Sequence, residues 1–450
     1  MFCQLETLRR CLPPSIRRTL EELPESLDET YERVLREIKK PNRDLAHRLL
    51  QCLVVAIRPL RVEELAEVLA VDFEDAEGTA KLNPSWRWED HEQALLSSCS
   101  SLITIVENVA MDSDNTEIQN DGSLVVQFSH FSAKEFLTSP RLASPNRDVS
   151  HYHIILEPAH TTMAQVCLAV LLRLDDGVGK NDAGNSSPLV RYAAKHWVAH
   201  AQFRSVSSRI RNAMECLFDP ERPYFAAWLR WYDMDTLNHI PPFVFFVTLK
   251  ESDGTPLYYA ALCGFRDLVE HLIAKCPDHA KAIGGYYQTA AVEALTGRHF
   301  ELARLLHRNG SSLDPPGTLR QTPLSSAAIS GDLEMVKVLL DNDADVNSRN
   351  EYGSSPLIVA SDYVGPQSLH IVRLLLHHGA NPNVWTSIRG TTPLHAASYR
   401  GNLEVVRLLV EYGADVERKN KEDRAPFEVA LEGRHHEVAL FLLFHGARHI

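Results

Sequence analysis

Residues 251–450 repeat one short motif at a nearly constant interval. The tetrapeptides Thr-Pro-Leu-Tyr, Thr-Pro-Leu-Ser, Ser-Pro-Leu-Ile, Thr-Pro-Leu-His and Ala-Pro-Phe-Glu start at positions 255, 322, 355, 392 and 425. Aligned on the Pro position, the series is Pro256, Thr289, Pro323, Pro356, Pro393 and Pro426, in steps of 33, 34, 33, 37 and 33 residues. Such a period dictates a linear array, because each small unit can bury its apolar surface only against its neighbours.

Each unit of the array predicts two helices joined by a tight turn. Pro393 suits the first turn of a helix, where no N–H donor is needed. After Gly401, the residues Val406, Leu409 and Val410 recur at helical spacing and give a second helix one apolar stripe. Motif and period are those of the ankyrin repeat. We therefore expect about six ankyrin repeats over 251–450, forming a solenoid with a concave surface.

Ankyrin arrays usually contact their ligands through the tips of the turns and the ends of the first helices. The residues of this chain at such places, which we predict to bind a protein ligand, are Tyr352, Tyr363, Arg389, Tyr399, Arg400 and Arg424. Tyr and Arg are enriched at binding hot spots. The competing interpretation, ordinary surface side chains, holds for any one of them taken alone.

The segment 42–140 predicts helices followed by a β-hairpin, which is the order of a winged-helix domain. Its expected elements are helices at 45–57, 62–69 and 90–97 and strands at 102–106 and 124–128, with an acidic loop between the strands. Between Arg43 and Ser139 there are 7 Lys or Arg and 17 Asp or Glu, a formal net charge of −10. A domain that binds phosphates carries a basic face, so we do not expect nucleic-acid binding.

Helical segments stand on both sides of this domain. Ser26 and Glu29 form a capping box that starts a helix in the segment 1–41. Its apolar face, for which the sequence shows no partner, consists of Leu27, Tyr31, Val34, Leu35 and Ile38. The segment 150–250 predicts helices at 161–174, 188–203, 207–218 and 223–234. We interpret it as a helical connector that docks the winged helix to the array, with Trp197 and His200 in its core.

Four strings occur in a specific order along the chain: Leu-Pro-Glu-Ser-Leu-Asp-Glu from 23, Arg-Pro-Leu from 58, Phe-Ser-His-Phe-Ser from 128 and Tyr-Ala-Ala-Lys-His-Trp from 192. Together they resemble fungal NACHT-type signalling ATPases of the STAND class, relatives of the NLR immune receptors, that carry C-terminal ankyrin repeats. The resemblance implies that 1–41 is the end of a NACHT module. It also implies an array that acts as a ligand sensor or scaffold, coupled to a regulatory winged helix.

The chain departs from that family because it contains no G-x-x-x-x-G-K-[ST] phosphate loop. We therefore expect a fragment, a truncated paralogue or a partial gene model that does not hydrolyse ATP, and the resemblance implies a NACHT ATPase module in cis or in trans as a second partner. In the family, a winged-helix histidine senses bound ADP, and His130 has the matching place. Without the ATPase module we favour a structural role for His130. A degenerate nucleotide-dependent switch and a winged-helix nucleic-acid binder are the alternatives.

No pattern in the sequence indicates catalysis. This type of winged helix is also associated by similarity with proteins labelled inositol deacylases, but the chain lacks the G-x-S-x-G elbow of a serine hydrolase and the H-E-x-x-H of a zinc protease. Its eight cysteines show no C-x-x-C spacing, and no apolar run reaches the length of a membrane span. We expect a mainly α-helical, non-enzymatic, cytoplasmic protein without catalytic residues, cofactor, metal or membrane segment.

Overall fold

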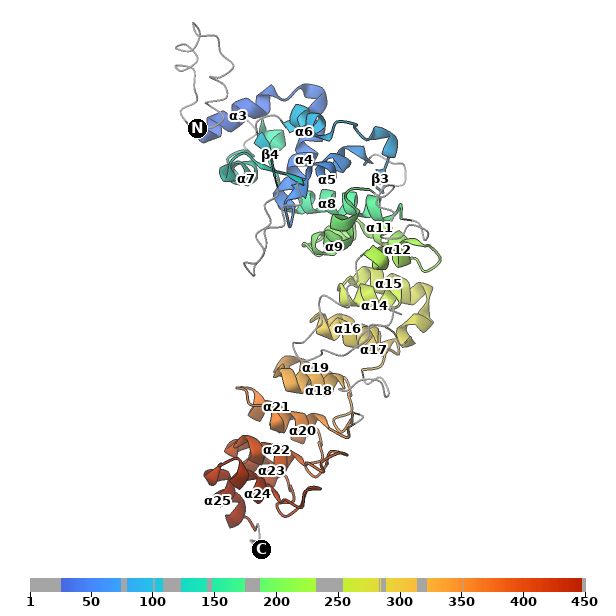
Figure 1. Ribbon diagram of the computed structural model, residues 1–450. Coiled ribbons are helices and arrows are strands. Elements are labelled where there is room, and N and C mark those ends of the chain that lie inside the picture. The colour runs from blue at the N-terminus through green and yellow to red at the C-terminus, as the bar shows by residue number, and fades with distance from the viewer. Residues whose placement is uncertain are drawn as a thin grey trace. The chain divides into compact units, whose positions relative to one another are not determined.

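The computed structural model describes residues 26–73, 79–99, 102–107, 123–143, 148–174, 187–231, 254–282, 284, 289–313, 322–350 and 352–446. The chain divides into two compact units, Met1–Val244 and Phe245–Ile450. Among the described residues, strands occur in the first unit and the second is built from helices and turns (Figure 1). The predicted fold class is confirmed: a mainly α-helical chain with a winged helix and a C-terminal ankyrin solenoid.

The first unit combines helices with short strands. Its helices are α3 (Leu27–Glu37), α4 (Arg43–Val55), α5 (Val62–Ala66), α6 (His91–Cys99), α7 (Phe131–Thr138), α8 (Leu156–Leu171), α9 (Val190–Ala201), α10 (Val206–Arg209), α11 (Arg211–Leu217) and α12 (Tyr224–Trp231). Its strands are β1 (Leu60–Arg61), β2 (Val71–Asp72), β3 (Lys81–Leu82), β4 (Ile103–Glu107) and β5 (Leu124–Phe128). Short 3-10 helices, η3 (Glu67–Ala70) and η4 (Pro84–Trp86) among them, connect several of these elements.

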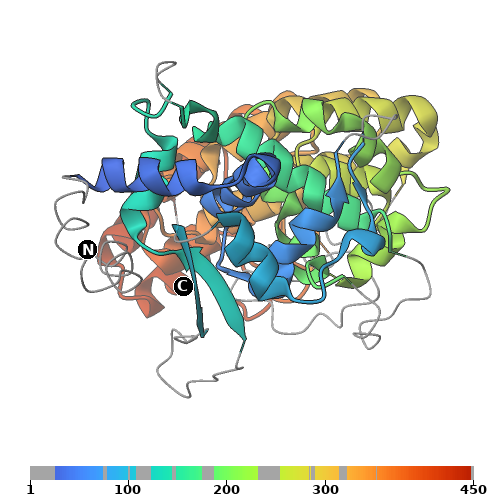
Figure 2. The same cartoon turned by 90° about the horizontal axis from the view of Figure 1, so that it is seen from above.

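The winged helix is built around a three-stranded antiparallel sheet in the order β1-β5-β4. Ile105 of β4 and Leu60 of β1 both lie opposite Val126 of β5, and the long strands lie side by side in Figure 2. The predicted pairing of β4 with β5 is confirmed. The acidic loop expected between them lies outside the described residues. The sequence did not predict β1, because two residues are too few to show an alternating pattern.

The partner of α3 is α7, which follows it by about 100 residues in the chain. The Tyr31 and Phe136 rings lie 5.3 Å apart between centroids, and the Tyr31 hydroxyl is 2.8 Å from the Ser132 hydroxyl. Ser26 caps α3 by accepting the Glu29 N–H, as expected. The sequence did not reveal this partner, and α7 supplies it. The first member of the apolar face is exposed, and its other members are buried: Tyr31, Val34, Leu35 and Ile38.

The connector packs into the same compact unit as the winged helix, since α8 contacts both α4 and α9. Trp197 is fully buried, and its ring lies 5.5 Å from that of Trp228 in an edge-on arrangement. The helix predicted at 207–218 is divided into α10 and α11, because Ile210, with φ −106° and ψ 16°, leaves the helical region. The core positions expected for Trp197 and His200 are confirmed. Docking of the connector to the array stays a prediction.

A chain of hydrogen bonds joins the end of α4 to the connector. The Ile57 N–H donates to the Tyr192 hydroxyl at 3.1 Å, and that hydroxyl lies 2.9 Å from His200 Nε2. His200 Nδ1 lies 2.9 Å from His160 Nδ1, so one ring must donate and the other accept. Burial, with smaller repulsion from His160 and His196, lowers the pKa of His200 to about 3. His200 is therefore neutral in the folded protein.

This network predicts acid-sensitive folding. The ordinary pKa of a histidine side chain is 6.5. Below that pH, His200 binds a proton in the unfolded chain but stays neutral in the folded chain. The contribution of His200 to the free energy of unfolding is at its maximum above pH 6.5 and decreases as the pH falls toward 3. Between pH 7 and pH 5 the loss is about 2 kcal/mol. His200→Gln should remove that part of the loss, measured by urea denaturation at both pH values. Equal acid sensitivity of variant and wild type would contradict the assignment.

The second unit contains the six predicted helix pairs, which follow one another along the array in Figure 1. The first helices of the pairs are α14 (Pro256–Leu262), α16 (Ala290–Thr296), α18 (Pro323–Ser330), α20 (Pro356–Asp362), α22 (Pro393–Arg400) and α24 (Pro426–Glu432). The second helices are α15 (Arg266–Lys275), α17 (Phe300–Arg308), α19 (Leu333–Asp341), α21 (Ser368–His377), α23 (Leu403–Glu411) and α25 (His436–Phe444).

The caps of the first helices correct the alignment of the second repeat. Thr255, Thr322 and Thr392 each precede a helix and accept the N–H three residues later. Thr289 does the same for α16, so it is the cap, and Ala290 holds the Pro position. Placing Thr289 there was wrong by one residue, because the position before the helix favours a hydroxyl that caps it, whereas Pro is suited to the first position of the helix. The first two steps of the repeat are therefore 34 and 33 residues.

Hydrogen bonds of polar side chains, one of them the buried His395, connect neighbouring repeats. His395 Nδ1 lies 2.7 Å from the Thr392 hydroxyl, and its Nε2 lies 3.0 Å from the Arg424 carbonyl of the next repeat. Asn383 accepts the Asp415 N–H at 2.8 Å in the same direction along the array. Burial lowers the pKa of His395, with a smaller opposing effect from its bond to the Arg424 carbonyl. The neutral ring can thus accept one hydrogen bond and donate another.

The corrected alignment predicts opposite results for proline at two adjacent positions. Ala290→Pro should change the free energy of unfolding by less than about 1 kcal/mol, because Thr289 before it is already extended, with φ −132° and ψ 148°. Thr289→Pro should cost more than about 2 kcal/mol, because it removes the cap and demands a φ near −65°. Denaturation followed by circular dichroism measures both. The reverse order would restore the alignment on Thr289.

Candidate protein-binding surface

Three loops of the array, here called fingers, precede the first helices of repeats four, five and six. They comprise residues 345–355, described except for 351, and residues 381–392 and 415–425. Backbone hydrogen bonds link them. The Ser387 N–H donates to the Tyr352 carbonyl at 2.8 Å, and the Lys421 N–H donates to the Arg389 carbonyl at 2.9 Å. The three fingers therefore lie side by side, although the residues that these hydrogen bonds join are more than 30 positions apart in the sequence.

The middle finger contains Trp385, and arginines of the other two fingers lie over its indole ring. The Arg418 guanidinium lies 4.2 Å from the centroid of the Trp385 ring, and that of Arg349 lies 5.8 Å from it. Arg349 also donates to the Trp385 carbonyl and, at 3.0 Å, to the Gly353 carbonyl. Trp385 nevertheless keeps 44% of its surface exposed. This group, the Trp385 stack, fixes an accessible aromatic ring with cations from the fingers before and after it.

Of the predicted contact residues, Tyr352, Arg389 and Arg424 lie on the fingers. Tyr352 and Arg389 are exposed. Arg424 forms ion pairs with Glu422 and Glu432, and the hydrogen bond to Glu432 is the main reason that its pKa is raised. Its charge is thus used within the sixth repeat.

The other three predicted residues, Tyr363, Tyr399 and Arg400, lie at the ends of first helices. Arg400 forms two hydrogen bonds of 2.9 Å with the Asp362 carboxylate of the preceding repeat. The same guanidinium lies 5.7 Å from the centroid of the exposed Tyr399 ring. Tyr363 is half-buried at the end of α20. The structure therefore divides the six predicted residues into a finger group and a helix-end group.

Sequence reasoning missed Trp385, Arg418 and Ile388, the last of which is 63% exposed. One signal was available for Trp385. It follows the repeated Asn383 by two residues, as Arg349 follows Asn347, so it is an aromatic residue in a turn that is otherwise polar. Arg418 gave no comparable signal, because its role depends on a ring in another repeat.

The positively charged side chains of the fingers differ in whether they form ion pairs. Lys419 pairs with Asp423 at 3.1 Å. Within the described part of the chain, Arg389 and Arg418 form no ion pair, and Arg418 lies over the Trp385 ring. Arg389, Trp385 and Ile388 are exposed on the fingers, and Arg418 is half-buried there.

His130 caps α7 in the winged helix. Its Nδ1 accepts the Ser132 N–H at 3.2 Å and lies 2.7 Å from the Ser132 hydroxyl, which in turn is 2.8 Å from the Tyr31 hydroxyl. The ring also lies 4.3 Å from that of the exposed Phe131. These contacts fit the structural role that the sequence favoured. A nucleotide-sensing role stays a prediction that depends on an ATPase module.

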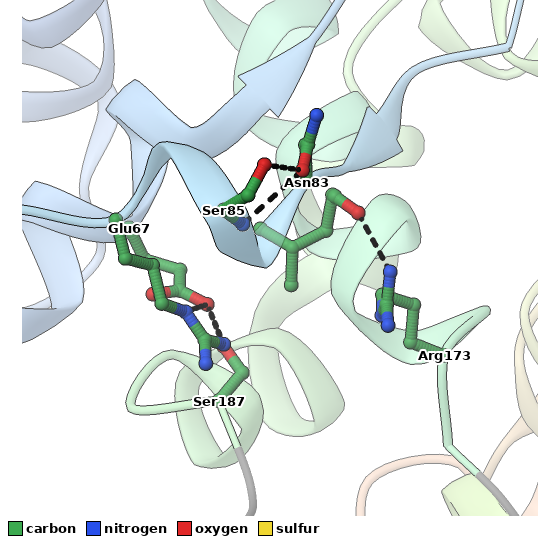
Figure 3. A network of polar contacts seen from close by, with 7 residues as sticks. Glu67, Asn83, Ser85, Arg173 and Ser187 are labelled. Atoms are coloured by element: carbon green, nitrogen blue, oxygen red, sulfur yellow. Dashed lines mark hydrogen bonds and ion pairs between the residues drawn. The ribbon is translucent and has the colours of Figure 1, made fainter.

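A second polar network holds the winged helix to the connector (Figure 3). The buried Glu67 carboxylate accepts two hydrogen bonds of 3.1 Å from Arg87 Nε and one of 2.8 Å from the Ser187 hydroxyl. Arg173 donates to the Leu82 carbonyl at 2.9 Å. Arg87 supplies the opposite charge that a buried carboxylate requires, so the network accounts for Glu67 structurally.

Metal-ligating side chains and cysteine thiols can be located in the parts of the chain that are described. There, no group of three or more His, Cys, Asp or Glu side chains is placed to hold a metal ion. Burial raises the pKa of both Cys52 and Cys99 to about 12, so these thiols are poor nucleophiles. The described helices include none that is long and apolar enough to cross a bilayer.

Two protein-family models match the chain. Ankyrin repeats match residues 288–386 and 367–449. The winged helix domain of GPI inositol-deacylase matches residues 31–146. The second match covers most of α3, in keeping with its packing against α7.

Similar proteins come from distant organisms. The chain is 29% identical to the azaphilone pigments biosynthesis cluster protein L of Monascus ruber, over 65% of its own length and 61% of that protein. It is 28% identical to an ankyrin repeat and KH domain-containing protein of Caenorhabditis briggsae, over 44% of its own length and 8% of that protein. It is 35% identical to human cyclin-dependent kinase inhibitor 2A, over 30% of its own length and 80% of that protein.

Proposed function

Because this chain belongs to the ankyrin-repeat proteins, we propose that it is a non-enzymatic protein-binding module whose array holds a protein ligand on its concave surface. The observation that carries the proposal is the Trp385 stack. A half-exposed indole, fixed by two guanidinium groups, has the features of a binding hot spot: a large apolar surface, little rotamer freedom and a central place among polar neighbours.

The side chains around the stack indicate what the ligand presents. Ile388 offers exposed apolar surface beside Trp385, whereas Arg389 and Arg418 offer positive charge. A ligand that buries this area needs an apolar or aromatic side chain flanked by carboxylates. The helix-end group, Tyr399 with Arg400, offers a second place of the same chemical kind.

The relatives support protein binding as the general activity. Human cyclin-dependent kinase inhibitor 2A is, by its name, an inhibitor of a protein kinase, and the array of this chain matches 80% of that protein. The ligand of the present array follows from the side chains of its own fingers, because a shared fold does not determine the partner.

The winged helix gives the proposal its regulatory part. We place the array as a ligand sensor or scaffold coupled to a winged-helix domain, in a cytoplasmic signalling protein of the NLR-like type. Its second partner would be a NACHT ATPase module in cis or in trans. The match to a winged-helix family and the similarity to a fungal cluster protein support this reading.

The stack predicts which substitution abolishes ligand binding. Trp385→Ala combined with Ile388→Ala should weaken the binding of a protein ligand by tenfold or more, about 1.4 kcal/mol or more, because both side chains would be buried in the complex. A ligand is first identified by cross-linking to the full chain, followed by mass spectrometry. Its affinity for wild type and variant is then measured by calorimetry.

A matched control removes an exposed aromatic ring outside the fingers. Tyr412 follows α23 and is 36% exposed, so Tyr412→Ala should leave the affinity unchanged. Circular dichroism melts show whether each variant keeps its fold. Equal affinity of the finger variant and wild type, or failure to recover any protein ligand, would overturn the proposal.

A further inference from the structure

Two tryptophan side chains of the winged helix are unusually exposed to solvent. Trp86 and Trp88 keep 47% and 53% of their surfaces exposed, although tryptophan is buried for the most part in folded domains. They flank Arg87 and are followed by Glu89, Asp90 and Glu92, all of them exposed. The two indoles with these three carboxylates are called the Trp86 surface below.

The segment that carries the two indoles is firmly held. Arg87 reaches inward to the buried Glu67 carboxylate, with a shortest distance of 2.5 Å, in the network of Figure 3. Before it, the Asn83 side chain accepts hydrogen bonds from the Ser85 N–H at 3.2 Å and the Ser85 hydroxyl at 2.6 Å. After it, Asp90 accepts the Gln93 N–H at 2.9 Å and begins α6. The two indoles are therefore exposed on a segment whose backbone is held in place by these hydrogen bonds.

The charged residues that follow the two indoles are all carboxylates. Arg87 is neutralised by Glu67 beneath it, so it does not balance the carboxylates outside. Within the described residues, Glu89, Asp90 and Glu92 form no ion pair. The faces of tryptophan rings also attract cations, which prefer indole to the other aromatic side chains. Rings and carboxylates thus favour the same kind of group, and phosphates or anionic lipids would be repelled.

We propose that the Trp86 surface binds a basic segment of a protein partner, with Arg or Lys side chains over Trp86 and Trp88 and paired with the neighbouring carboxylates. Complementary charge identifies this occupant, because an apolar partner would leave three carboxylates unpaired at the edge of the contact. The site lies on the winged helix and does not involve the fingers, so it stands or falls independently of ligand binding by the array.

The probe is a short, fluorescently labelled peptide of alternating Gly and Arg, titrated with the full chain and followed by anisotropy at about 0.15 M salt, where distant charges are screened. The double variant W86A/W88A should weaken binding by tenfold or more. A peptide with citrulline in place of every Arg should bind at least tenfold more weakly to wild type. Equal binding of the two peptides, or of variant and wild type, would overturn the proposal.

Charge-matched variants separate this surface from the acidity of the whole chain, whose formal net charge is −13. E89Q/D90N/E92Q should weaken the peptide severalfold, and it retains an Asn to cap α6. E404Q/E411Q/E437Q removes the same charge from the array and should leave binding unchanged. If the two charge variants weaken binding equally, attraction is non-specific and the proposal fails.

Self-association is tested with the same proteins. Analytical ultracentrifugation of wild type and W86A/W88A shows whether a second copy of the chain covers the indoles. A dimer that dissociates in the double variant would replace the basic partner by a second copy and overturn the proposal. Monomers in both cases, together with the peptide results above, would support it.

Discussion

Burial of a repeat against its neighbour is the interaction on which the second unit depends. The first helices pack on one another in two runs, α14 on α16, and then α18 on α20, α20 on α22 and α22 on α24. Leu357 and Leu394, which lie in these contacts, are almost fully buried. A helix pair of about 20 residues has too little apolar surface to fold alone. The polar bonds of His395 then fix the relative position of repeats that apolar burial has already brought together, and the fingers are placed as a consequence.

Much of the fold could be predicted from the sequence, because long helices and strands repeat their apolar residues at a measurable period. The six helix pairs and the pairing of β4 with β5 were predictable in this way. The failures concern features that no period reveals: a single hydroxyl, a strand of two residues, and a contact between distant segments. The register of repeat two depends on the Thr289 hydroxyl, β1 is only two residues long, and α3 packs on α7 about 100 residues later.

The candidate site was predictable in kind but not in detail. Tyr352 and Arg389, which the sequence placed at turn tips, lie exposed on the fingers, and their part in binding stays a prediction. The sequence could not show that Trp385 lies beside two arginines from other repeats, since that contact requires the fingers to be side by side. It also could not show that Arg424 is paired within its own repeat. Residue type selects candidates, whereas the internal contacts decide which of them remain available.

The two surfaces that we propose share one arrangement. In each, an arginine bonds to other groups of the protein and so fixes the segment that presents an exposed indole. Arg349 donates to the carbonyls of Gly353 and Trp385 and so holds Trp385 in place. Arg87 pairs with Glu67 and fixes the backbone between Trp86 and Trp88. The charges left outside are opposite: guanidinium groups surround Trp385, and carboxylates follow Trp88. The two proposed surfaces therefore differ in the charge of the group that each would bind: an acidic ligand at the Trp385 stack and a basic segment at the Trp86 surface.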